Sequence, residues 1–223
     1  MKLFSIDSPV YKFMQRLWDV FKLNMLWLLC SLPIITIGIS TTAAFKVTLD
    51  MVDDKEGKIA HDFFKAFKEN WKQGIPLSFI MIICPLAVWY DFQIYNALET
   101  NSLPFLLLGV FAAFIFTFSL LYLFPLIARY ENSVINSLRN SFELSMKFFG
   151  RTILLVLIVA FEFAVLMWNT TTLFVGLLIG PVCIIYTISG TAMHIFHEME
   201  KIPGSVRENE PEEKSDGNDS DKE

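Results

Sequence analysis

Glu162 is the residue whose type and position first suggest chemistry. It lies near the middle of an apolar run, in the string LIVAFEFAVLMW, and is the only formally charged residue of that run. A charged side chain at the centre of a membrane helix costs about 2.5–3.5 kcal/mol on insertion scales, so an acid at that depth is a functional hypothesis. It can carry a proton, or hold a substrate or a partner. The alternative is a protonated Glu162 that is hydrogen-bonded to a neighbouring helix, or one that is paired with Lys46.

Two histidines beside an acid raise the question of a metal site. His194, His197 and Glu198 lie in the string HIFHEME, which places the two imidazoles about one helical turn apart. The string lacks the H-E-x-x-H order, and no cluster of Cys or Asp accompanies it. We therefore expect two histidines at a membrane surface and no bound metal.

Other catalytic patterns are missing from the sequence. It has no glycine loop to cradle a phosphate, no nucleophile elbow and no paired carboxylates, and no polar stretch is long enough to hold an active site. The three cysteines, Cys30, Cys84 and Cys183, lie in separate apolar runs, as buried small hydrophobic residues do. The sequence predicts a non-enzymatic protein with no cofactor and no nucleic-acid partner.

The composition indicates a membrane protein. Hydrophobic residues make up 54% of the 223 residues, and the mean hydropathy is +0.48, well above the apolar share of a soluble domain. Five apolar runs approach or exceed the roughly 17 to 25 residues that a helix needs to cross a bilayer. The runs are residues 23–45, 74–90, 103–128, 152–168 and 173–195. Runs of this length without strand alternation predict helices, which bond their own backbone groups inside lipid.

Positive charge alternates between the connections. Short cytoplasmic loops carry an excess of Lys and Arg. The counts are four in residues 1–22, six in 46–73, none in 91–102, four in 128–151, none in 169–172 and four in the tail. From the second run onward this pattern alternates fully, and it predicts a cytoplasmic C-terminus.

The first apolar run has basic residues on both sides, which a single crossing would separate. Either residues 23–45 cross once, with the N-terminus outside, or they enter from the cytoplasm, turn and return. Pro33 removes a backbone donor and Gly38 permits unusual dihedrals, so a break over Pro33, Thr36 and Gly38 favours a re-entrant hairpin. The hydroxyl-rich limb that follows suits packing against protein better than open lipid. A kinked ordinary span is the alternative, and both remain open at this point.

Three polar segments with helical periodicity precede apolar runs. They are residues 1–22, with a helix start at Ser8-Pro9, residues 61–72 and about 134–149. The second segment combines an aromatic face with flanking lysines, and its candidate surface is Phe63, Phe64, Lys65, Phe67, Lys68 and Trp71. Basic amphipathic helices suit the headgroup boundary. These helices orient the adjacent spans, or they form a docking surface for another membrane protein.

Small and hydroxyl residues mark the last apolar run as a packing surface. Gly176 and Gly180 are four residues apart, and Thr187 and Thr191 continue the spacing. Small residues along one stripe allow helices to approach closely. We expect helix packing here rather than a polar transport path.

Three stretches resemble the YesL family of small bacterial integral membrane proteins, whose activity is not established. They are NMLWLLCSLPIITIGISTTAAFKVTLDMV from Asn24, FFKAFKENWKQG from Phe63 and FPLIARYENSVINSLRNSFELSMKFF from Phe124. The resemblance covers about residues 1–200, and the first stretch is its most specific part. It implies the bacterial plasma membrane and an association with carbohydrate-uptake and polysaccharide-degradation systems, and it supplies no catalytic residues.

The sequence as a whole predicts an all-α polytopic membrane bundle of four to five spans with cytoplasmic amphipathic helices. Its parts are a surface helix in residues 1–22, a membrane domain in 23–200 and a disordered acidic tail in 201–223, where eight acids face four bases. The expected function is that of a non-enzymatic accessory or regulatory partner of a bacterial carbohydrate-uptake system, with the lipid bilayer and transporter components as partners. The alternative is a small transporter or channel that uses Glu162.

Overall fold

The fold is all-helical, as predicted. The computed structural model describes residues 9–55, 57–97, 103–130 and 133–201, and within these it contains helices and no strand. The helices are α1 (Pro9–Ser31), the short 3-10 helix η1 (Ile34–Thr36), α2 (Ile37–Val52), α3 (Ile59–Glu69), α4 (Trp71–Ala97), α5 (Leu103–Arg129), α6 (Val134–Lys147), α7 (Phe149–Leu166), α8 (Thr170–Leu177) and α9 (Gly180–Glu200). The predicted acidic tail and the helix start at Ser8 lie outside the described residues.

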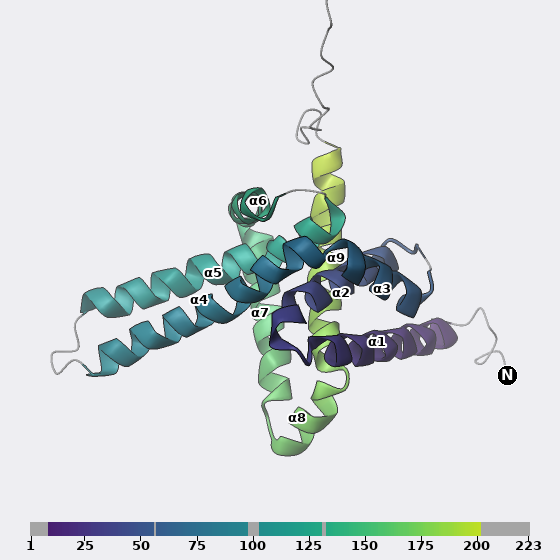
Figure 1. The fold of residues 1–223 in the computed structure, drawn as a ribbon, viewed down its shortest axis with the longest axis horizontal. Helices are drawn as coiled ribbons and strands as arrows, with labels where there is room; N and C mark the ends of the chain where they lie inside the picture. Colours follow the sequence, from purple (N-terminus) through teal and green to yellow (C-terminus); the bar gives the residue numbers. More distant parts are fainter. Residues whose placement is uncertain (1–8, 56, 98–102, 131–132, 202–223) are drawn as a thin grey trace, which may run out of the picture.

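Four segments are long and apolar enough to cross a membrane. Within the described part of the chain they are residues 34–52, 71–97, 103–129 and 149–166. The prediction of an all-α polytopic membrane bundle is therefore confirmed. Helices α4 and α5 form a long hairpin, here called the α4–α5 arm, which points away from the centre of the molecule, and α7 with α8 points in a different direction (Figure 1).

The first apolar run folds into an antiparallel hairpin of α1 and α2. Trp27, near the end of α1, donates its indole N–H to the Thr41 hydroxyl at 3.1 Å. At the other end of the pair, Arg16 donates to the Met51 carbonyl and to the Asp54 carboxylate, the latter at 2.8 Å. The basic segments on either side of the run therefore meet at one end of the hairpin. The predicted surface helix is continuous with the first limb, because α1 runs unbroken from residue 9 to 31.

Helix α2 lies at the centre of the molecule. Of its spanning window, 72% is buried inside the protein, against 11% for α4. Its closest neighbour is α4, at a point where two glycines face each other. A Cβ built on Gly38 would stand 2.5 Å from the Gly74 carbonyl oxygen and 2.5 Å from the Ser78 backbone nitrogen. The absence of a side chain at Gly38 is thus what lets the two backbones touch.

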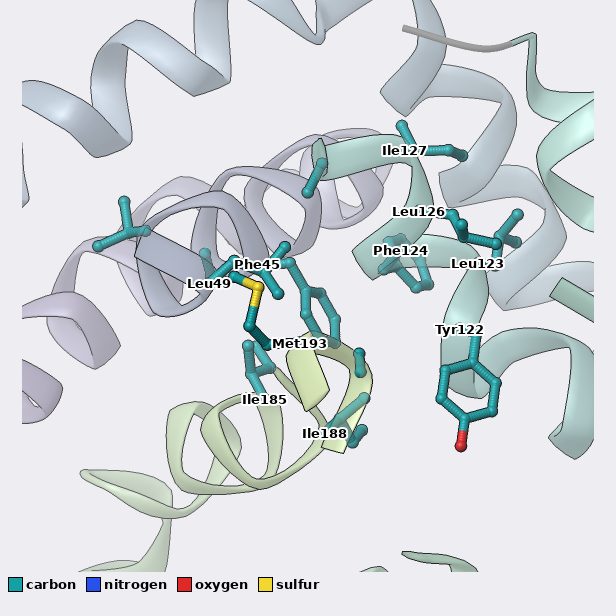
Figure 2. Close-up of a cluster of buried hydrophobic side chains, with 14 of the residues drawn as sticks. Phe45, Leu49, Tyr122, Leu123, Phe124, Leu126, Ile127, Ile185, Ile188 and Met193 are labelled. Carbon is teal, nitrogen blue, oxygen red and sulfur yellow. The ribbon is translucent and has the colours of Figure 1, made fainter. Parts of the chain in front are cut away.

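Apolar side chains of α2, α5 and α9 fill the centre of the bundle (Figure 2). Phe45 of α2 stacks on Phe124 of α5, with ring centroids 5.8 Å apart. Leu49 and Met193 are buried beside them. In a lipid environment the gain from this cluster is van der Waals packing rather than transfer out of water.

Helix α6 packs against α5 through serines and leaves several apolar side chains exposed. Ser133 caps its N-terminus by accepting the Asn136 backbone N–H. Ser145 donates to the Phe118 carbonyl of α5 at 2.6 Å, and Ser141 donates to the Ser119 carbonyl. Three apolar side chains of α6, those of Ile135, Leu138 and Met146, are exposed, whereas Leu144 is buried. Small serines allow α6 to approach α5 closely.

The last apolar run differs from the single helix expected for residues 173–195. It is divided into α8 and α9, which are separated at Leu178 and Ile179, and α9 is not among the four spanning segments. Pro181, in the first turn of α9, has no backbone N–H and favours a helix start at this point. Gly176 and Gly180 therefore lie on different helices, and both pack against Leu166 of α7.

The glycine contact predicts a stability effect. Gly38→Ala should destabilise the protein by about 1–3 kcal/mol, because the added methyl overlaps the α4 backbone and forces the two helices apart. Thermal unfolding of the purified protein in detergent measures this.

Gly150→Ala is the matched control. A Cβ at Gly150 meets no atom within 4 Å, so this variant should be neutral or slightly stabilising through helix propensity. Equal unfolding temperatures for the two variants would contradict a close α2–α4 contact at Gly38.

Candidate functional site within the helical bundle

The break between α1 and α2 is closed by hydrogen bonds from two hydroxyl side chains. Thr36 donates to the Cys30 carbonyl at 2.6 Å, and its backbone N–H donates to the Pro33 carbonyl at 2.9 Å. Ser78, which comes from α4, accepts the Gly38 N–H at 2.8 Å and donates to the Ile35 carbonyl at 2.7 Å. Groups freed by a broken helix are thereby bonded without water. Pro33 and Thr36 lie in this break, whereas Gly38 lies inside α2 at its contact with α4.

Asn24 does the same for the second break, between α8 and α9. It is fully buried in α1, and its amide nitrogen donates to the Leu177 carbonyl at 2.9 Å. Its amide oxygen accepts the Val182 N–H at 3.1 Å. One side chain thus serves the last residue of α8 and the first turn of α9, where helix ends leave backbone groups without intrahelical partners.

The hydroxyls of α2 are bonded inside the protein. Thr42 donates to the Gly38 carbonyl at 2.8 Å, and Thr41 to the Ile37 carbonyl at 2.7 Å. Thr48 shares a hydrogen bond of 2.7 Å with Ser189 of α9. Ser40 is fully buried, and its hydroxyl has no hydrogen-bond partner among the described residues. Most of the hydroxyl side chains of α2 are therefore explained by packing within the protein rather than by an open polar path.

Glu162 faces α9 from the last third of α7, four residues before the helix ends at Leu166. Its Oε1 accepts a hydrogen bond of 2.7 Å from the Thr187 hydroxyl. Its Oε2 is buried and has no hydrogen-bond partner in the part of the chain that the structure describes. Lys46 forms an ion pair with Asp50 at 3.9 Å, so the suggested pairing with Glu162 is not observed. Thr187, which the sequence predicted as a helix-packing residue, is the hydrogen-bond donor to Glu162.

Charged side chains gather where α5 ends, α7 begins and α9 ends, a region called here the charged end. Arg151 donates to both oxygens of Glu198, at 2.7 and 2.8 Å. This two-point hydrogen bond lowers the pKa of the Glu198 carboxyl below its ordinary value. Arg129 forms an ion pair with Glu200 at 2.7 Å. Both acids of α9 are thus paired with arginines from other helices.

The two histidines of α9 contact different acids. His197 lies 3.3 Å from Asp53, which follows α2, and His194 lies 3.6 Å from Glu198. The Lys55 ammonium, hydrogen-bonded to Asp53, lowers the pKa of that carboxyl, and His197 adds to the effect. No group of three His, Cys, Asp or Glu side chains that could hold a metal ion is found in the described ranges.

The predicted docking surface of α3 is only partly available. Phe63 is fully buried, so the prediction that it belongs to that surface was wrong. The residue lies on the side of α3 that faces the core, next to the buried Ala66, and Phe67 is half-buried. The members that are exposed are Phe64, Lys65, Lys68 and Trp71.

Sequence reasoning missed three polar residues that the fold places between packed helices. Asn24 and Ser78 bond the two helix breaks. Asp91 of α4 lies against Gly109 of α5, and its Oδ2 is buried with no hydrogen-bond partner in the described segments. A signal was present for Ser78, which follows Gly74 by four residues and so completes a small-xxx-small pattern. Asn24 could have been noticed as an amide at the start of an apolar run.

Comparison with known proteins gives one match. The model of a protein family described as "Protein of unknown function, DUF624" matches residues 20–92. This region contains the second half of α1, the break, α2, and the contact of α2 with α4. Proteins of the YesL type carry this domain. No curated protein and no solved structure matches the chain at a significant level.

The hydrogen bonds at the first break predict a difference between two buried serines. Ser78→Ala leaves the Gly38 N–H and the Ile35 carbonyl without their side-chain partner, and it should destabilise the protein by about 1–3 kcal/mol. Ser40→Ala removes a hydroxyl that has no partner among the described residues and should be neutral or stabilising. Thermal unfolding in one detergent compares the pair. Similar losses for both variants would show that burial of the site, not its hydrogen bonds, sets the cost.

Proposed function

We propose that this protein is a non-enzymatic, multi-pass accessory protein of a bacterial plasma membrane. Its partner is a transporter component of a carbohydrate-uptake system, and the contact is made through the α4–α5 arm. The choice of partner rests on the resemblance to the YesL family, and the match to a family described only as of unknown function agrees with that resemblance at the level of the domain.

The exposure of the α4–α5 arm is the observation that carries this proposal. Only 11% of the α4 spanning window is buried by the rest of the chain, and the arm extends away from the central helices (Figure 1). The outer side of α5 has an apolar groove of about 580 Å³, lined by Pro104, Leu107, Leu108, Val110, Phe111 and Phe114. Membrane helices associate by van der Waals packing of such complementary surfaces.

The position of the charges supports an orientation for the protein. The basic flanks of the α1–α2 hairpin meet at Arg16 and Asp54, and Arg129 and Arg151 lie at the charged end. Because cytoplasmic segments carry the excess of Lys and Arg, these regions and the C-terminus face the cytoplasm. Residues 9–54 then enter and leave on the same side, as the re-entrant alternative requires.

Photo-crosslinking in native membranes tests the partner. A benzophenone amino acid at Phe111, which is 61% exposed on the arm, should capture a sugar-transporter component after growth on an inducing sugar. The same probe at Phe161, which is 70% exposed on α7, is the control and should capture lipid. Adducts with lipid alone at Phe111, or the same proteins at both sites, would contradict the proposal.

A small transporter or channel is the second candidate, and Glu162 favours it. The acid lies between two helices at the centre of an apolar segment, with one oxygen held by Thr187 and the other without a partner among the described residues. Intramembrane acids of this kind often belong to proton or ion pathways.

Proton flux into reconstituted vesicles tests this second candidate. Glu162→Gln should abolish the flux, because the amide keeps the hydrogen bond to Thr187 but cannot release a proton. Asp91→Asn, which changes the other buried acid oxygen without a partner in the described segments, should leave it unchanged. A flux that is equal in wild type and Glu162→Gln would remove Glu162 from the mechanism.

A further inference from the structure

A groove between α7 and α9 leads from the charged end toward Glu162. It has a volume of about 480 Å³, and it is lined by Arg151, Leu154, Leu155, Ile158, Gly190, Thr191 and His194. The volume exceeds that of several water molecules, and the polar groups of the arginine, threonine and histidine can hydrogen-bond water along one part of a lining that also contains leucine and isoleucine. The apolar groove on α5 offers no such side chains.

The deep end of the groove adjoins the Glu162–Thr187 pair. Ile158 precedes Glu162 by one helical turn on α7, and Thr191 follows Thr187 by one turn on α9, so the pair lies one layer beyond the lining residues. The Thr191 hydroxyl lies 3.4 Å from the Thr187 carbonyl. Thr187 in turn donates to Glu162 Oε1 at 2.7 Å. The Thr187 hydroxyl that holds the acid is thus one helical turn from the groove lining at Thr191.

The ionisable groups around this path lie at its two ends. At the mouth, His194 is mostly exposed and lies 3.6 Å from Glu198, which is bonded to Arg151. Beyond the groove lining, Cys183 precedes Thr187 by one helical turn on α9. Helix α2, which packs on α9 from another side, contributes the Thr48 hydroxyl to Ser189.

We propose that Glu162 is a proton-binding site that is loaded from the charged end through the α7–α9 groove, with Thr187 as the relay. A hydronium ion in the groove gives a proton to the Thr187 hydroxyl oxygen and becomes water. The hydroxyl passes its own proton to Glu162 Oε1, so that one O–H bond forms on the carboxylate as one breaks on the threonine. The ligand of this site is a proton delivered by water. The inference deepens the second candidate function, but it requires neither a partner protein nor net transport.

Infrared spectroscopy of the carboxyl group in the full-length protein tests the site. The wild-type spectrum should show a protonated-carboxyl C=O band that grows as the pH falls and that is missing in Glu162→Gln. On transfer to D₂O this band should shift at a measurable rate, because the carboxyl proton exchanges through the groove. If no band is lost in Glu162→Gln at any pH, the proposal is overturned.

Substitutions in the groove decide the route of exchange. A Cβ at Gly190 meets no atom within 4 Å, so the side chain of Gly190→Leu has an open start and would extend into the groove, and it should slow the shift in D₂O several-fold. Gly150→Leu, at an equally open position outside the groove lining, should leave the rate unchanged. Equal rates in wild type and Gly190→Leu would overturn the route.

The relay has its own pair of variants. Thr187→Val is similar in shape but has no hydroxyl, and it should slow the exchange, whereas Thr187→Ser should restore it. Unchanged exchange in Thr187→Val would overturn the relay. Thr191→Val, which changes the groove lining with little change in volume, should give a smaller slowing and serves if Gly190→Leu fails to fold. Because the readouts are a carboxyl band and its rate of exchange, failure here is distinguishable from a lack of flux in vesicles.

Discussion

The fold depends on the bonding of backbone groups where helices break inside an apolar protein. Lipid offers no hydrogen bonds, so a broken membrane helix needs side-chain partners from elsewhere in the chain. Thr36 and Ser78 supply them between α1 and α2, and Asn24 supplies them between α8 and α9. Each break is thus joined to a distant helix. The same bonds that satisfy the backbone also fix α4 against α2 and α1 against α9.

These bonds explain why the most polar of the candidate spans is also the most buried. Helix α2 carries several hydroxyl side chains, and burial among α1, α4, α5 and α9 gives them partners such as Ser189 and nearby backbone carbonyls. The glycine contact at Gly38 and Gly74 brings α4 close enough for Ser78 to reach the break. With its polar groups used internally, the chain leaves its apolar helices α4, α5 and α7 for lipid or for another membrane protein.

The α7–α9 side of the molecule also carries polar groups. There α7 and α9 hold an acid whose second oxygen has no partner among the described residues, and the groove lined by Arg151 and Thr191 lies one helical turn from it. The arginine pairs of Glu198 and Glu200 link the ends of α5, α7 and α9 to one another. This arrangement is the geometric basis of the proposed proton path.

The sequence by itself determined the helical class, the membrane character and most of the apolar segments, because length and composition decide whether a helix suits a bilayer. It also indicated the break near Pro33, and it identified Glu162 as an acid within an apolar run. Only the tertiary structure decided which groups serve the breaks, since Ser78 is more than 40 residues from the break it bonds and Asn24 more than 150 residues from its own. Tertiary packing likewise buried Phe63, because periodicity describes one helix and not the neighbours that cover it. The division of the last apolar run, by contrast, had a local signal in Pro181 that the sequence analysis did not use.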